Sequence, residues 1–217
     1  MTLRIASLLL ASALTGCAAG AQPATNPPVE PGPAGGEAPA GVMVKAPVNP
    51  ADVNFMTGMI AHHAQALVMA RWAPTHGASD AVKVLAERII VGQNDEIRLM
   101  QRWLRDRDQP VPSVDAPMDH AAHGMGHGGM MPGMLTPDQL AQLDQARGPV
   151  FDWMFLNYMI QHHRGAVTMV DALFGSQGAA QDEPVFKIAS GVYADQTTEI
   201  ERMQKMLQAL PPEGPHE

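Results

Sequence analysis

The sequence contains only one cysteine, Cys17, among its 217 residues. An internal disulfide needs a second thiol, so none can form within the chain. A metal centre built on several thiolates is excluded for the same reason, and a blue-copper electron-transfer site is not expected. Any soft metal ligand must therefore be a methionine thioether, and the chain contains 16 methionines.

Positive charge is also scarce. The chain has 14 Lys and Arg residues against 22 Asp and Glu residues, which gives a formal net charge of −8. This balance argues against nucleic-acid binding and against a polybasic membrane-binding surface. The chain has no Gly-x-Ser-x-Gly motif and no glycine loop of the kind that binds phosphate. We therefore expect a protein that is not an enzyme.

Long apolar runs are absent apart from one near the N-terminus, which resembles a targeting segment. In residues 1–16, Arg4 precedes a short apolar run that cannot span a bilayer as a mature helix. The run ends in LTGC at residues 14–17, which resembles the signal of bacterial lipoproteins. This predicts lipid attachment at Cys17 and a location in the cell envelope or periplasm, anchored to a bacterial membrane. An ordinary secretory cleavage site is the alternative.

A tether and one helical domain are predicted to follow this signal peptide. Residues 17–48 are rich in Pro, Gly and Ala, which predicts a flexible tether without a core. The domain is predicted over residues 49–210. Apolar periodicity, caps and prolines predict long helices over about 50–73, 79–107, 150–174 and 182–210, with a short helix from Thr136 to about Arg147.

The two halves of this domain repeat each other. FMTGMIAHHAQALVMARWA at 55–73 matches FLNYMIQHHRGAVTMVDAL at 155–173, although the halves differ at other positions, such as Gln65 and Gly165. The repeats cover about 49–108 and 149–210, with a Met/His-rich loop and the short helix at 109–148 between them. Each repeat is a helical hairpin with an apolar stripe. Two hairpins that bury each other's stripes predict an all-α four-helix bundle.

Both repeats keep two adjacent histidines among methionines. The candidate metal ligands are Met59, His62, His63, Met69, Met159, His162, His163 and Met169. On a helical wheel, His63 and His163 lie at the centre of an apolar face, and His62 and His162 lie at its edge. Because a buried imidazole costs free energy unless it is satisfied, the repetition favours a metal site. The alternative is histidines bonded to carboxylates in an ordinary core, with methionines that only pack.

Further side chains are expected either to bind the ion as extra ligands or to hydrogen-bond the metal-binding histidines. They are Asp52, Glu96, Met100, Asp152, Glu199 and Met203. Glu96, for example, is expected either to bind a metal or to accept the free N–H of a metal-binding histidine. Whether each hairpin forms its own site or both hairpins share one is left open by the sequence.

A second group of donors lies in the loop that reads PMDHAAHGMGHGGMMPGM at 117–134. The donors are Met118, His120, His123, Met125, His127, Met130, Met131 and Met134. Imidazole suits Cu(II), Zn(II) and Ni(II), whereas thioether selects Cu(I). Copper uses both donors across its two oxidation states, so we predict copper, with zinc or nickel as weaker possibilities. A glycine-rich linker with incidental histidines is the alternative.

The motifs together resemble a known family. These motifs are the duplicated M-I-x-H-H-x-x-A-x-x-M, the Q-x-x-E-I-x-x-M of the partner helices and the linking M-P-G-M-L-T-x-x-Q-L. They are similar to the family long called domain of unknown function 305, which includes the CopM-type copper-binding proteins, over about 50–210. The resemblance implies a ferritin-like four-helix fold, an extracytoplasmic location and copper binding through Met and His at the eight helical positions named above.

The leading hypothesis is a non-enzymatic copper-binding lipoprotein that sequesters copper or hands it to a copper-handling partner, supporting copper tolerance. The first alternative is a metal-free structural or interaction lipoprotein of the envelope. A ferritin-like metal oxidase is less well supported, because such sites need Glu-x-x-His on two helices. The predicted helices contain no Glu-x-x-His. The oligomeric state is left open.

Overall fold

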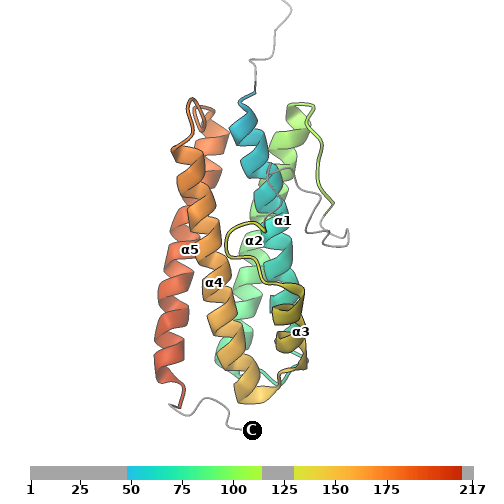
Figure 1. Ribbon diagram of the computed structural model, residues 1–217, viewed down its shortest axis with the longest axis vertical. Coiled ribbons are helices and arrows are strands. Elements are labelled where there is room, and N and C mark those ends of the chain that lie inside the picture. The colour runs from blue at the N-terminus through green and yellow to red at the C-terminus, as the bar shows by residue number, and fades with distance from the viewer. Residues whose placement is uncertain (1–47, 114–129, 212–217) are drawn as a thin grey trace, which may run out of the picture. The chain divides into compact units, whose positions relative to one another are not determined.

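The computed structural model describes residues 48–113 and 130–211 (Figure 1). The predicted signal peptide, nearly all of the tether and the lipidation site Cys17 lie outside these residues. The same holds for five of the predicted loop donors. These are Met118, His120, His123, Met125 and His127.

Five helices make up the described structure, and none of its residues forms a strand. They are α1 (Pro50–Trp72), α2 (Asp80–Asp106), α3 (Pro137–Gln145), α4 (Gly148–Phe174) and α5 (Glu183–Ala209). Side chains cap the beginnings of α1 and α2, at Asn49 and Ser79. Thr136 and Gln139 form the predicted capping box of α3. No helix in the described ranges has the length and hydropathy of a membrane span.

The four long helices form the predicted all-α bundle, which is therefore confirmed. α1 packs against α2 and α4, and α5 packs against α4 and α2. The short helix α3 lies beside α1 and α4. Figure 1 shows α1 and α4 running in opposite directions along the bundle. The two hairpins, α1–α2 and α4–α5, thus cover each other's apolar faces.

The antiparallel packing of α1 and α4 divides the core into two apolar clusters. One cluster contains Met59, Met100 and Met169, and the other contains Met69, Met159 and Met203. Each cluster therefore combines methionines from both halves of the chain. Along α1 and α4, the paired histidines lie between a methionine of one cluster and a methionine of the other. The fold thus places all four histidines near the middle of the bundle.

The predicted position of His62 and His162 at the edge of an apolar face is wrong. Both side chains have 0% exposure, and α1 is buried around most of its circumference. The helical wheel assumed one packed face for each helix. In the structure, α2, α4 and the segment 131–135 cover α1 from different sides.

This crossing segment is fixed by one residue from each of the two central helices. The side chain of Gln65 donates from Nε2 to the carbonyl of Leu135 (3.0 Å) and accepts from its backbone N–H (2.7 Å). On α4, a Cβ added to Gly165 would lie 2.0 Å from the carbonyl oxygen of Pro132. Gly133 has φ +74°, which favours glycine. The segment can therefore cross α4 only where the helix has no side chain.

Asp52 and Asp152 fix the hairpin turns. Asp52 Oδ1 accepts from the backbone N–H of Ala180 (2.7 Å), between α4 and α5. Asp152 accepts from the backbone N–H of Ser79 (3.1 and 3.2 Å), directly before α2. Each half thus holds the turn of the other half. The structure gives both carboxylates this role, and their suggested role as extra ligands stays a prediction.

Replacing Gly165 by Ala should lower the unfolding free energy, because the new Cβ collides with the segment that crosses α4. Such overpacking typically costs about 1–3 kcal/mol, more than the roughly 1 kcal/mol that Ala gains over Gly inside a helix. The matched control is Gly191→Ala on α5, where an added Cβ meets no atom within 4 Å. It should stabilise the protein by about 1 kcal/mol. Circular dichroism on heating measures both variants, and stabilisation by Gly165→Ala would contradict the crossing.

Candidate metal centre

Four imidazole rings form a row in the middle of the core. The rings of His62 and His162 meet across the two halves, with centroids 3.8 Å apart and an interplanar angle of 40°. His63 continues the row on one side, with its centroid 6.4 Å from that of His62, and His163 continues it on the other side at 6.2 Å from His162. All four side chains are fully buried. The two halves therefore share one cluster of histidines.

Two carboxylates orient the outer histidines. His63 Nε2 donates to Glu96 Oε2 (2.7 Å), and His163 Nε2 donates to Glu199 Oε2 (2.6 Å). The carboxylate contact expected for Glu96 is therefore present, and it is repeated in the second half. An imidazole that donates through Nε2 keeps its lone pair on Nδ1. This is how outer partners commonly orient a metal-binding imidazole.

The inner histidines also have ring nitrogens free to bind an ion. His62 Nε2 donates to the carbonyl of Pro132 (3.0 Å). Among the described residues, Nδ1 of each of the four histidines has no hydrogen-bond partner, and neither has Nε2 of His162. One buried polar atom without a partner costs about 1–3 kcal/mol, so five in one cluster are unusual. A metal ion that accepts these lone pairs would satisfy them.

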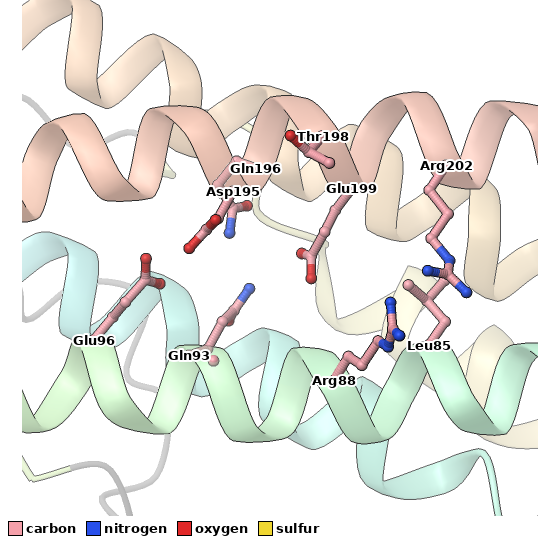
Figure 2. Close-up of a pocket in the computed structure, with 10 residues that line it drawn as sticks. Leu85, Arg88, Gln93, Glu96, Asp195, Gln196, Thr198, Glu199 and Arg202 are labelled. Carbon is pink, nitrogen blue, oxygen red and sulfur yellow. The ribbon is translucent and has the colours of Figure 1, made fainter.

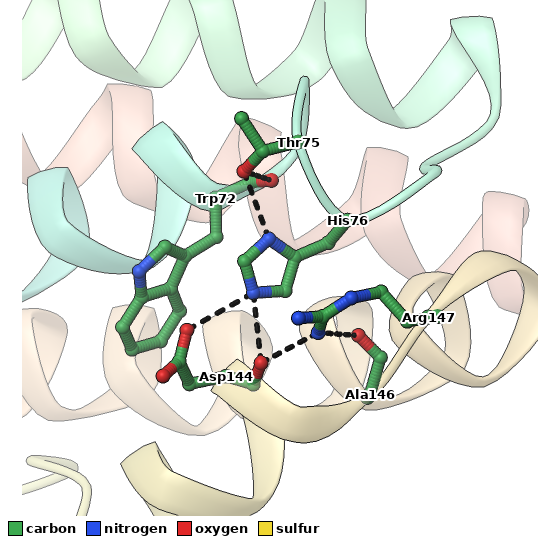
Figure 3. Close-up of polar contacts among 6 residues, drawn as sticks. All are labelled: Trp72, Thr75, His76, Asp144, Ala146 and Arg147. Carbon is green, nitrogen blue, oxygen red and sulfur yellow. Dashed lines mark hydrogen bonds and ion pairs between the residues drawn. The ribbon is translucent and has the colours of Figure 1, made fainter.

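His76 shows what an ordinary buried histidine looks like in the same protein (Figure 3). Its Nε2 donates to the backbone carbonyl of Asp144 (2.9 Å) and lies 3.0 Å from Oδ1 of the same residue. Its Nδ1 lies 2.9 Å from the hydroxyl oxygen of Thr75. Both ring nitrogens thus have partners. His63 and His163 share with the alternative of satisfied core histidines a bond to a carboxylate. They differ from His76, as do His62 and His162, because each keeps a ring nitrogen without a partner among the described residues.

Burial keeps the inner histidines neutral. Burial, together with the neighbouring His63, lowers the pKa of His62 to about 3. Burial likewise holds the pKa of His162 well below its usual value. Metal ions bind the neutral imidazole. At neutral pH, an ion therefore need not displace a proton from either inner ring.

Methionines precede and follow the histidine pair along each of the two central helices. Met59, Met69 and Met159 are fully buried and Met169 nearly so. The sequence left open whether each hairpin forms its own site, and the structure places Met59 in one cluster with Met169 of the opposite half. The two further candidates, Met100 and Met203, are buried in the same apolar clusters, where they pack.

The described end of the Met/His-rich loop approaches the helical methionines. Met134 is buried, Met131 is half-buried and Met130 is 43% exposed. A Cβ added to Gly58 would lie 3.3 Å from Met169 Cε and 3.6 Å from Met131 Sδ. Gly58 thus leaves space where thioethers of the loop and of α4 converge. A cavity of about 410 Å³ opens beside them.

The side chains that could bind an ion at the centre of the bundle are of two chemical kinds. Across residues 48–113 and 130–211, no three His, Cys, Asp or Glu side chains are grouped so that they could hold an ion. The candidate donors of the row and of the two apolar clusters are imidazole nitrogens and thioether sulfurs. These residues fit a soft or borderline ion that accepts both kinds of ligand.

Comparison with known proteins places this fold in a family. The family profile described as Domain of unknown function (DUF305) matches residues 52–207. The chain belongs to the DUF305 family. The resemblance predicted from the duplicated motifs is thereby confirmed. A curated relative, an uncharacterised protein of Acanthamoeba polyphaga mimivirus, is 36% identical over 56 residues. This match covers 26% of the chain and 37% of the relative.

Several solved structures are similar over most of the chain. A DUF305 protein of Streptomyces coelicolor has 29% identity and a TM-score of 0.63, covering 77% of this chain and 98% of its own. A DUF305 fragment of Deinococcus radiodurans has 29% identity and a TM-score of 0.62, and the match covers 76% of this chain and 99% of the fragment. CopM in its Cu(II)-bound form has 30% identity and a TM-score of 0.57, and the match covers 73% of this chain and 96% of the CopM chain.

Sequence reasoning missed Gln65 and Gly165, which position the segment that bonds to His62. The two residues occupy equivalent places in the two halves. Their difference looked like free divergence between the repeats. This difference is itself the signal that could have revealed both residues. The crossing segment is hydrogen-bonded by Gln65 in the first half, and it needs the absence of a side chain at Gly165 in the second half.

Because the pKa values of His62 and His162 are low, the folding stability of the metal-free protein should fall as the pH falls. In the unfolded chain both inner histidines titrate near pH 6.5, whereas folded His62 titrates at about 3. The unfolded state therefore binds more protons between these values, and the metal-free protein should lose stability as pH falls below 6.5. Each histidine contributes up to about 1.4 kcal/mol per pH unit.

Urea unfolding at pH 7, 6, 5 and 4 in the presence of a chelator measures this dependence. The double variant His62→Leu/His162→Leu should lose less stability on acidification than the unsubstituted chain. Equal pH slopes for the two proteins would contradict the assignment of neutral, buried imidazoles.

Proposed function

We propose that this protein binds copper outside the cytoplasm, sequesters it or hands it to a copper-handling protein, and so supports copper tolerance without catalysing a reaction. The observation that carries the proposal is the row of four buried imidazoles, each with an unpartnered Nδ1, between two methionine-containing clusters. The similarity to CopM supports it further, since CopM has been solved in Cu(I)-, Cu(II)- and Ag-bound forms.

The central histidines favour the cuprous ion. His62 and His162 supply neutral nitrogen, and the flanking clusters supply neutral sulfur. Moving an ion into an apolar core costs more as its charge rises, so a monovalent cation suits this place better than a divalent one. Thioether sulfur selects Cu(I) as well. Zinc and nickel are the weaker possibilities, because neither prefers thioether ligands.

The Met/His-rich loop is the proposed point of entry. Its described end brings Met130 and Met131 to the cavity of about 410 Å³ that Met169 also lines. Ions captured by the loop would pass from these exposed or half-buried sulfurs to the buried ones. The fall in exposure from Met130 at 43% to Met59 at 0% supports this proposed direction of transfer.

The N-terminal segment supports a place in the cell envelope. Residues 1–16 and the LTGC sequence favour export followed by lipid attachment at Cys17. The Streptomyces coelicolor relative was solved as a candidate secreted protein. A lipid anchor would keep the domain at a membrane surface, where copper entering the envelope can be captured.

Anaerobic titration with Cu(I) against a competing chelator tests the proposal, with thermal unfolding as a second readout. We expect binding of Cu(I) and a stabilised native state, by about 2.7 kcal/mol when free copper is a hundredfold above Kd. The double variant His62→Ala/His162→Ala should bind the tightest ion at least tenfold more weakly, because both inner nitrogens are gone.

The matched control is His76→Gln, which removes a buried histidine whose nitrogens already have partners. It should lower the melting temperature and leave copper affinity unchanged. Two results would contradict the proposal. One is an unsubstituted protein that neither binds copper nor is stabilised by it, and the other is a double variant with unchanged affinity.

A further inference from the structure

A separate polar cavity lies where α2 and α5 meet. Its volume is about 210 Å³, whereas one buried water needs about 15 Å³ by a comparable measure. Gln93 and Glu96 reach it from α2, and Asp195, Gln196 and Glu199 reach it from α5 (Figure 2). It is large enough for a small ion together with several waters.

Three carboxylates give this cavity an acidic lining. Glu96 and Glu199 each bond a histidine through Oε2, which leaves Oε1 free. Asp195 is an exposed residue that lines the cavity and has no hydrogen bond or ion pair with any described residue. Partial desolvation, helped by the charges of Glu96 and Glu199, raises its pKa. Arg88 and Arg202 also line the cavity, in Figure 2 at the end away from Glu96 and Asp195. The carboxylates thus repel one another, and a cation between them would relieve this repulsion.

Two buried amides point independently to a ligand. Gln93 is 2% exposed and Gln196 is 1% exposed. Neither Nε2 nor Oε1 of Gln93 has a hydrogen-bond partner in the described structure, and the same is true of Oε1 of Gln196. Figure 2 shows both amides turned into the space between the helices. An apolar residue of similar shape would avoid the free-energy cost of an unpaired amide, so the presence of these two amides indicates that they bind a ligand.

We propose that this cavity binds a hydrated divalent cation of the Mg²⁺ type, held by the amide oxygens of Gln93 and Gln196 and by Asp195. Amide carbonyls and carboxylates are the donors that hard cations prefer. No three acidic or histidine side chains in the described structure are grouped to hold an ion directly. Mg²⁺ fits such a cavity because it keeps several waters and needs only one or two carboxylates.

This site is chemically distinct from the row of histidines. It offers oxygen donors only, whereas the centre of the bundle offers nitrogen and sulfur, so the two places select different ions. Glu96 and Glu199 lie between them, since each carboxylate lines the cavity and bonds a histidine of the row. The cation site does not depend on copper binding.

Mn²⁺ serves as the probe, since it also accepts oxygen ligands and its free form is counted by electron paramagnetic resonance. Titration of the full chain, purified free of copper, should show one bound Mn²⁺ that excess Mg²⁺ displaces. Asp195→Asn and Gln93→Leu should each weaken binding at least tenfold. The matched control, Glu201→Gln on the exposed side of α5, should leave it unchanged.

Both test variants are expected to fold. Asp195→Asn preserves shape, and Gln93→Leu removes an unpaired amide and should raise the melting temperature without Mn²⁺. Absence of Mn²⁺ binding, or equal affinity in all three variants, would overturn the cation site. Cu(I) titration of Asp195→Asn keeps the two proposals distinguishable, because copper affinity should equal that of the unsubstituted protein.

Discussion

His62 and His162 meet ring against ring where the two hairpins cross, and the surrounding structure is arranged around this contact. Apolar clusters lie on both sides of the row, the segment 131–135 covers it, and Glu96 and Glu199 orient its outer members. Neutral imidazoles with unpartnered nitrogens destabilise a core by themselves. The packing of four long helices must offset that cost, and an ion bound by the nitrogens would remove it.

The fold was predictable because its determinants are local. Caps such as Asn49 and Ser79 and apolar periodicity fixed the helix boundaries to within about two residues, and the repeated motif implied two matching hairpins. The candidate ligands and the contact of Glu96 with His63 followed from the same pattern. The burial of His62 and the grouping of Met59 with Met169 did not follow, because they depend on how the hairpins cross.

The turn contacts of Asp52 and Asp152 were not predicted, for a related reason. Their repetition in both halves resembled that of the histidines, yet each binds a backbone amide in the turn of the opposite half. Repetition alone therefore does not separate a residue that binds an ion from one that holds a turn. What separates them here is the partner, since the carboxylates have theirs and the Nδ1 atoms of the histidines have none.

The bundle thus carries soft donors at its centre and hard donors between α2 and α5, with His63 and His163 hydrogen-bonded to acids of the second group. Diffraction from crystals loaded with Cu(I), recorded on both sides of the copper absorption edge, tests the central claim most directly. The account predicts an anomalous peak within bonding distance of Nδ1 of His62 or His162. Copper peaks found only elsewhere in a fully loaded protein would contradict it.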